Sequence, residues 1–140
     1  MSHVDIKSLL GIDADTIEVL MNRAATLYSE GQFEAMRKTL SGVIALSPDD
    51  PRPHTLIGSS YLLEGRDRDA DTAYQAAYER DPSDPYTLVA LGELKLRALD
   101  LKSAVTYFEK LFTSTTDHTH PARLRGQALV REYHAKLGGS

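Results

Sequence analysis

Two histidines in a polar segment, His118 and His120, are the residues of this sequence best suited to bind a metal ion. Histidines at this spacing could supply two ligands, but a catalytic zinc site requires a third fixed protein ligand. Asp117 is the only acidic residue beside them, and the polar, β-branched run 113–121 predicts a loop. We therefore predict no metal site in this segment.

An acidic run, Asp67, Asp69 and Asp71, has the spacing that opens a calcium-binding loop. Such a loop needs glycine at its sixth position and glutamate at its twelfth, where this sequence has Thr72 and Tyr78. The calcium interpretation therefore fails. These aspartates are instead predicted at the start of a helix, where the helix dipole favours negative charge.

Ser59 and Ser60, next to Gly58, are the remaining candidates for a nucleophile. Both are predicted inside a helix, and no base lies beside them in the sequence. The sequence also lacks a nucleophile elbow, a phosphate-binding loop and a dinucleotide-binding fingerprint. We therefore predict that the chain is not an enzyme and uses no cofactor.

The elements that position these residues recur at a fixed spacing. Gly58 is followed by Gly92 and Gly126, and Tyr74 by Phe108, at the interval of about 34 residues that is typical of a tetratricopeptide repeat. Glycine inside a helix costs about 1 kcal/mol relative to alanine, so its recurrence indicates positions where two helices pack closely. Each repeat is expected to be a pair of helices joined by a turn.

The repeats predict an all-α fold, a tetratricopeptide-repeat solenoid that forms a single domain over residues 1–140. It consists of three helix-turn-helix repeats between two terminal helices. The predicted boundaries are 2–12 for a short N-terminal helix, 17–50, 51–84 and 85–118 for the repeats, and 119–137 for a C-terminal capping helix.

Composition excludes several other classes of protein. The formal net charge is -4, whereas a nucleic-acid-binding protein needs a basic surface. The sequence has no cysteine, so it has no disulfide framework and no thiolate metal site. It also has no long apolar run and no signal-peptide pattern at its start, so we expect a cytoplasmic protein that does not insert into membranes.

A concave groove is expected along the first helices of the repeats. Counting from the start of each repeat, the second, fifth, ninth and twelfth positions should face inward. The predicted peptide-binding groove consists of Met21, Ala25, Tyr28, Thr55, Ser59, Leu62, Tyr86, Val89, Glu93 and Leu96, with Arg123 and Gln127 from the last helix. This largely apolar lining predicts a client protein that contributes an extended peptide or an amphipathic helix. Alternatively, the protein's own N-terminal helix covers some of these positions.

The N-terminal helix has an apolar face formed by Ile6, Leu9 and Leu10. A helix this short is not stable alone and must dock on another surface. It either caps the first repeat or pairs with a second protomer, which would make the protein a homodimer.

Residues 9–112 resemble the class II chaperones of bacterial type III secretion, which protect translocator proteins. The resemblance rests on the lead-in LLGIDADTIEVLMNRAATLYSEG, with its short helix, acidic helix start and tyrosine-bearing first repeat, and on the two repeats that follow. It implies that a proline- and leucine-containing client segment contacts Tyr28, Leu62, Tyr86 and Val89. It also implies dimerisation through the N-terminal helix.

The leading hypothesis is therefore a bacterial cytoplasmic chaperone that holds an apolar segment of a secretion translocator. The alternative is a general scaffold that joins other proteins into complexes. Tetratricopeptide domains that bind the acidic C-termini of heat-shock chaperones carry basic and amide residues in the groove. This chain has Met21, Ala25 and Leu56 at such positions, so that type of co-chaperone is not predicted.

Overall fold

The computed structural model describes residues 9, 11 and 13–138. Within these residues the secondary structure is entirely helical, as the repeat pattern predicts. The helices are α2 (Ala14–Ser29), α3 (Phe33–Leu46), α4 (Arg52–Leu63), α5 (Asp67–Arg80), α6 (Pro85–Arg97), α7 (Leu101–Ser114) and α8 (Pro121–Lys136).

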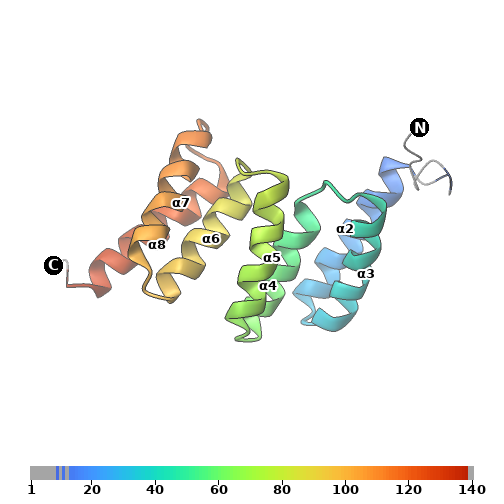
Figure 1. The fold of residues 1–140 in the computed structure, drawn as a ribbon, viewed down its shortest axis with the longest axis horizontal. Coiled ribbons are helices and arrows are strands. Elements are labelled where there is room, and N and C mark those ends of the chain that lie inside the picture. Colours follow the sequence, from blue (N-terminus) through green and yellow to red (C-terminus); the bar gives the residue numbers. More distant parts are fainter. Residues whose placement is uncertain (1–8, 10, 12, 139–140) are drawn as a thin grey trace.

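Consecutive helices pair as α2 with α3, α4 with α5, and α6 with α7. The pairs stack side by side, so that α2 and α8 lie at opposite ends of the array (Figure 1). The first helices of neighbouring pairs touch one another, α2 with α4 and α4 with α6. They form one layer, and the second helices, α3, α5 and α7, form the other.

Two recurring glycines allow close contact within these pairs. A Cβ atom on Gly58 would lie 2.5 Å from the ring of Tyr74, and one on Gly92 would lie 2.7 Å from the ring of Phe108. Real Cβ contacts are essentially never this short, so the rings of α5 and α7 occupy the space that a side chain would need. The close approach inferred from the spacing of the glycines is confirmed.

Local signals explain where the helices begin and turn. Asp13 accepts a hydrogen bond from the backbone N–H of Thr16 at 2.9 Å and is therefore the N-cap of α2. Gly31 and Gly65 both have φ of +75°, a conformation that side-chain-bearing residues rarely adopt, and they form the turns inside the first two pairs.

The core is continuous along the stack rather than centred at one point. The α2–α3 pair buries Ala24, Met36 and Leu40, and the next interface buries Tyr74 and Leu91. Each pair of helices therefore buries its apolar face against its neighbours, as expected for a repeat protein.

The last helix, α8, packs differently from the other first helices. Toward the preceding pair, it makes more extensive contact with the first helix, α6, than with the second, α7, whereas α4 and α6 each contact the second helix of the preceding pair more than its first. α8 therefore lies over the first helix of the third pair.

The prediction for the N-terminal helix at residues 2–12 falls largely outside the described residues, as do Ile6 and Leu10. Leu9 is described, and its side chain is 70% exposed.

Candidate peptide-binding groove

Polar contacts cross from one first helix to the next along a single face of the stack. Arg52 of α4 forms an ion pair with Glu18 of α2 at 2.8 Å. On the other side of α4, the hydroxyls of Thr55 and Thr87 are 3.0 Å apart, which joins α4 to α6. These contacts hold the first-helix layer together at the predicted groove.

The first repeat contributes Met21, Ala25 and Tyr28. Ala25 is exposed, and the other two side chains are half-buried. The Tyr28 ring packs against Phe33 with centroids 5.8 Å apart. Burial raises the pKa of the Tyr28 phenol, and the negative charge of Glu93 on α6 raises it further.

The second repeat contributes Thr55, Ser59 and Leu62, which are all half-buried. The hydroxyls of Ser59 and Tyr74 are 3.0 Å apart. Because Gly58 has no side chain, the Tyr74 ring can cross beneath α4 and bring its hydroxyl to this face. Burial is the main reason that the pKa of Tyr74 is raised to about 12.

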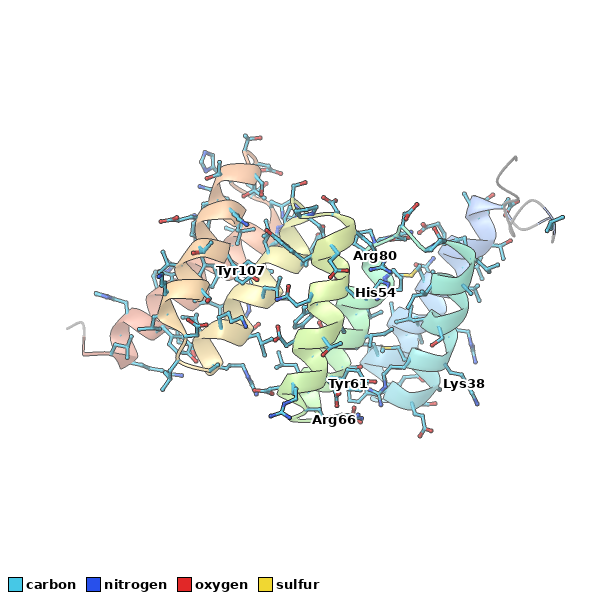
Figure 2. The ribbon with its side chains drawn as sticks, viewed as in Figure 1. Lys38, His54, Tyr61, Arg66, Arg80 and Tyr107 are labelled. Carbon is cyan, nitrogen blue, oxygen red and sulfur yellow. The ribbon has the colours of Figure 1, made fainter. Side chains whose placement is uncertain are left out.

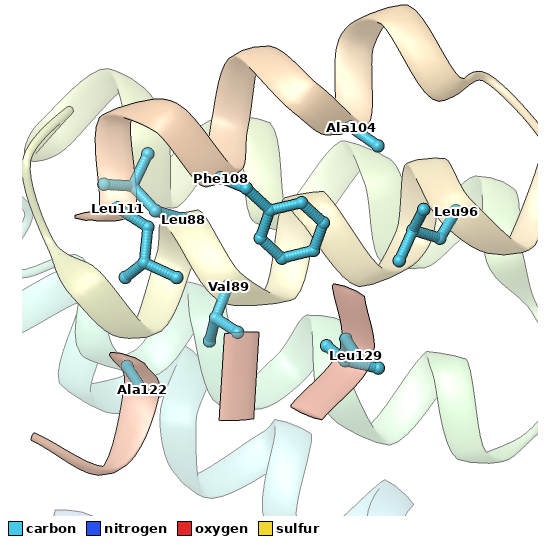
Figure 3. Close-up of a cluster of buried hydrophobic side chains, with 8 residues drawn as sticks. All are labelled: Leu88, Val89, Leu96, Ala104, Phe108, Leu111, Ala122 and Leu129. Carbon is cyan, nitrogen blue, oxygen red and sulfur yellow. The ribbon is translucent and has the colours of Figure 1, made fainter. Parts of the chain in front are cut away.

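The third repeat is covered in part by α8. Tyr86 remains 52% exposed, and its ring lies 5.2 Å from that of His120. Val89 and Leu96 are only 9% and 6% exposed and share a cluster with Leu129 of α8 (Figure 3). In this structure, these two predicted groove residues therefore pack under the protein's own last helix.

Glu93, the polar member of the third repeat, forms an ion pair with Arg125 of α8 at 2.7 Å. The two side chains are 27% and 52% exposed, so this pair lies at the surface where α8 meets α6. Arg125 was not among the predicted groove residues. The predicted groove residues of the last helix are Arg123 and Gln127.

Arg123 and Gln127 both lie toward α7. Arg123 donates hydrogen bonds to the backbone carbonyls of Phe112 and Thr115 at 2.9 and 2.8 Å, so it caps the C-terminus of α7. Gln127 borders a cavity of about 440 Å³ that is also lined by Phe112, Val130 and Arg131. The structure therefore brings neither residue together with Glu93.

Of the two histidines considered as metal ligands, His120 makes a hydrogen bond that stabilises a helix start. The Nδ1 atom of His120 accepts a hydrogen bond from the backbone N–H of Ala122 at 3.1 Å, which caps α8, and His118 is exposed. Among the residues that the structure describes, no cluster of three or more histidine, cysteine or acidic side chains could hold a metal ion.

The acidic run at the start of α5 is paired with basic side chains. Asp67 pairs with Arg97 at 3.2 Å, and Asp69 with Arg66 at 2.9 Å. Arg66 also lies 4.4 Å from the ring centroid of Tyr61, at the turn between α4 and α5 (Figure 2). These contacts support the interpretation of the aspartates as helix-start residues.

Residues 51–84 match a sequence family described as Tetratricopeptide repeat. These are also the residues of the second predicted repeat. The fold is a tetratricopeptide-repeat solenoid. Within the described range, no helix combines the length and apolarity needed to cross a membrane.

Solved structures of this fold include bacterial secretion chaperones. The type III secretion translocator chaperone SycD of Yersinia enterocolitica matches with a TM-score of 0.81 and 20% identity, over 94% of this chain and 99% of that one. PcrH, a Pseudomonas aeruginosa protein, was solved in complex with the chaperone-binding region of PopB. It matches with a TM-score of 0.71 and 22% identity, over 85% of this chain and 98% of that one.

The tetratricopeptide domain of Sgt2 from Aspergillus fumigatus is also similar. It matches with a TM-score of 0.71 and 17% identity, over 89% of this chain and 83% of that domain. At these levels of identity the likeness establishes a shared fold.

Proposed function

We propose that this protein is a chaperone that holds an apolar segment of a translocator-like client in the concave groove, in the bacterial cytoplasm. The observation that carries the proposal is the similarity to SycD over nearly the full length of both chains. PcrH, which shares this fold, binds the chaperone-binding region of PopB. A chaperone of this kind would shield the segment from aggregation until the client is exported.

The client segment is proposed to run along α2 and α4, where the groove is open. Met21, Ala25 and Tyr28 would contact one part of the segment and Leu62 the next, while Thr55 and Ser59 offer hydrogen bonds to its backbone. The segment would end near Tyr86 and Glu93, because α8 lies over Val89 and Leu96. This arrangement shortens the groove relative to the one expected from the sequence.

The test is co-expression with a candidate translocator, with the soluble fraction of the translocator as the readout. The wild-type protein should increase that fraction. Ala25→Glu should abolish the increase, because it places a charge against an apolar segment, at a cost of several kcal/mol if the charge is left unpaired. Thr26→Glu is the matched control, since Thr26 is exposed about 100° further around the same helix.

If the translocator is equally soluble with and without this protein, the chaperone proposal is wrong. If Thr26→Glu is as damaging as Ala25→Glu, the binding surface is not the groove.

The second candidate function is a general scaffold for protein assembly. It is favoured by the similarity to the Sgt2 domain, a tetratricopeptide domain from a fungus. A scaffold would co-purify with folded partners and leave the solubility of a translocator unchanged. Dimerisation through Ile6, Leu9 and Leu10 stays a prediction under either function.

A further inference from the structure

Two adjoining cavities lie between α5 and α7, in the layer of second helices. The larger has a volume of about 320 Å³ and the smaller about 160 Å³. Both are bordered by Tyr78 and Lys110. Because the groove is formed by the first helices, these cavities belong to a different surface of the protein.

The surface of the larger cavity is mainly apolar, although Ser83, Thr113 and Ser114 also border it. The smaller cavity is bordered by Ser103 and Thr106 as well as by two tyrosines. Tyr78 packs edge-to-face on Tyr107, with ring centroids 5.8 Å apart and an interplanar angle of 87°. Gln75 donates a hydrogen bond to the Tyr107 hydroxyl at 3.3 Å, which fixes that ring on α7. Pro82 and the fully buried Leu88 complete the larger cavity. Its volume is at the lower end of the range of preformed ligand pockets, about 300–1,000 Å³.

A positive charge lies at the boundary of the two cavities. The Lys110 ammonium donates a hydrogen bond to the Tyr78 hydroxyl and lies 5.0 Å from the centroid of that ring. This hydrogen bond raises the pKa of Lys110, whose side chain is cationic at neutral pH even at its ordinary pKa. An ammonium group has three N–H donors, so two of them are available to a ligand.

Among the lysines that the structure describes, Lys110 is one of three that form no ion pair, together with Lys38 and Lys102. Lys95 and Lys136 each lie within 4 Å of a carboxylate, on Asp71 and Glu132 respectively. In the part of the chain that the structure describes, Lys110 has the Tyr78 hydroxyl as its polar partner and forms no such pair. Lys110 is therefore an exposed cation at the edge of the larger, mainly apolar cavity, in a protein whose net charge is -4.

We propose that the two cavities between α5 and α7 together bind a short acidic peptide segment of a partner protein. An aliphatic side chain of the peptide would lie between Tyr78 and Leu88, and a neighbouring carboxylate would pair with Lys110. The charge of the site favours an acidic ligand, whereas the rest of the acidic surface repels one. Two connected cavities suit a peptide, because successive side chains can enter each in turn. This site is independent of the groove, so a client and a second partner could bind together.

The test uses the full chain and a fluorescein-labelled hexapeptide that alternates aspartate with leucine. Binding is measured by fluorescence anisotropy at low and at physiological ionic strength. We expect Lys110→Glu to weaken binding by about tenfold or more, the loss expected when a hydrogen bond to a charged group is removed. Raising the salt concentration should also weaken binding to the wild-type protein.

Lys38→Glu is the matched control, because Lys38 is an exposed lysine on α3, away from this site. The Lys38→Glu variant should bind the peptide as the wild type does. A peptide with asparagine in place of aspartate should bind to the wild-type protein at least about tenfold more weakly. Unchanged affinity of Lys110→Glu would overturn the proposal. So would an equal loss in Lys38→Glu, because it would mean that net charge alone governs binding.

Discussion

Replacing Gly58 with alanine tests the close packing on which each helix pair is built. The added Cβ would lie 2.5 Å from two ring carbons of Tyr74. Non-bonded carbon atoms pack at about 3.5–4.0 Å, so the ring must move by about 1 Å. It has little room to do so, because Tyr74 is 1% exposed and its hydroxyl is within hydrogen-bonding distance of Ser59.

The size of the effect follows from opposing contributions. Overpacking a core costs about 1–3 kcal/mol, and losing the Ser59 hydrogen bond costs about 1 kcal/mol more. Alanine recovers about 1 kcal/mol through its higher helix propensity. We therefore expect Gly58→Ala to lower the free energy of unfolding by about 1–3 kcal/mol, which corresponds to a fall in Tm of several °C.

Gly42→Ala is the matched control. Gly42 also lies within a helix, α3, but a Cβ added there would have no heavy atom within 4 Å. This variant should be more stable than the wild type by about 1 kcal/mol. Urea unfolding followed by circular dichroism measures both variants. If Gly58→Ala proved as stable as Gly42→Ala, the ring of Tyr74 would not limit the contact and the packing argument would be refuted.

Three further predictions concern the groove and its neighbours. Leu62→Glu should abolish client binding in a pull-down, whereas Leu63→Glu should preserve it, because Leu63 is 63% exposed one position further along α4. Since the pKa of Tyr74 is about 12 in the folded protein and about 10 when unfolded, the unfolded state loses its proton first. Stability should therefore fall between about pH 10 and 12, and this fall should be smaller in Tyr74→Phe when unfolding is measured at pH 9 and 11. Glu93→Gln should lower the pKa of Tyr28 toward its ordinary value in an ultraviolet titration, and an unchanged pKa would mean that the two residues do not face a common groove.

Much of the fold could be predicted because the repeat spacing reports local packing. Gly58 and Gly92 indicated where two helices touch, and Tyr74 and Phe108 are the rings that fill those contacts. A residue that must be small and a ring that must be large recur together in the second and third repeats. Their spacing therefore predicted both the helix pairs and the turns between them.

The placement of α8 could not be predicted in the same way. Gly126 keeps the spacing of Gly58 and Gly92, but a Cβ on it would meet Leu111 of the preceding helix at 2.6 Å. In the earlier repeats the glycine meets the second helix of its own pair. Gly126 instead meets a helix of the preceding pair, because α8 packs against α6 and α7. Spacing along a sequence does not determine this choice of neighbour.

That choice changed which residues border the groove. Arg125, rather than Arg123, reaches Glu93, and Val89 is covered rather than open. The signal in the sequence was indirect: the polar run 113–121, which predicts a loop, separates α8 from the third repeat. After such an interruption, the following helix need not pack on its neighbours as the first helices of the earlier pairs do.

The most direct test of the central claim is site-specific photo-crosslinking between this protein and a co-expressed translocator. A photoreactive amino acid is placed at Ala25, in the open part of the groove, or at Thr26 on the same helix. The account predicts that the translocator crosslinks at position 25 and not at position 26. Crosslinking at position 26 alone, or equally at both, would contradict binding in the groove.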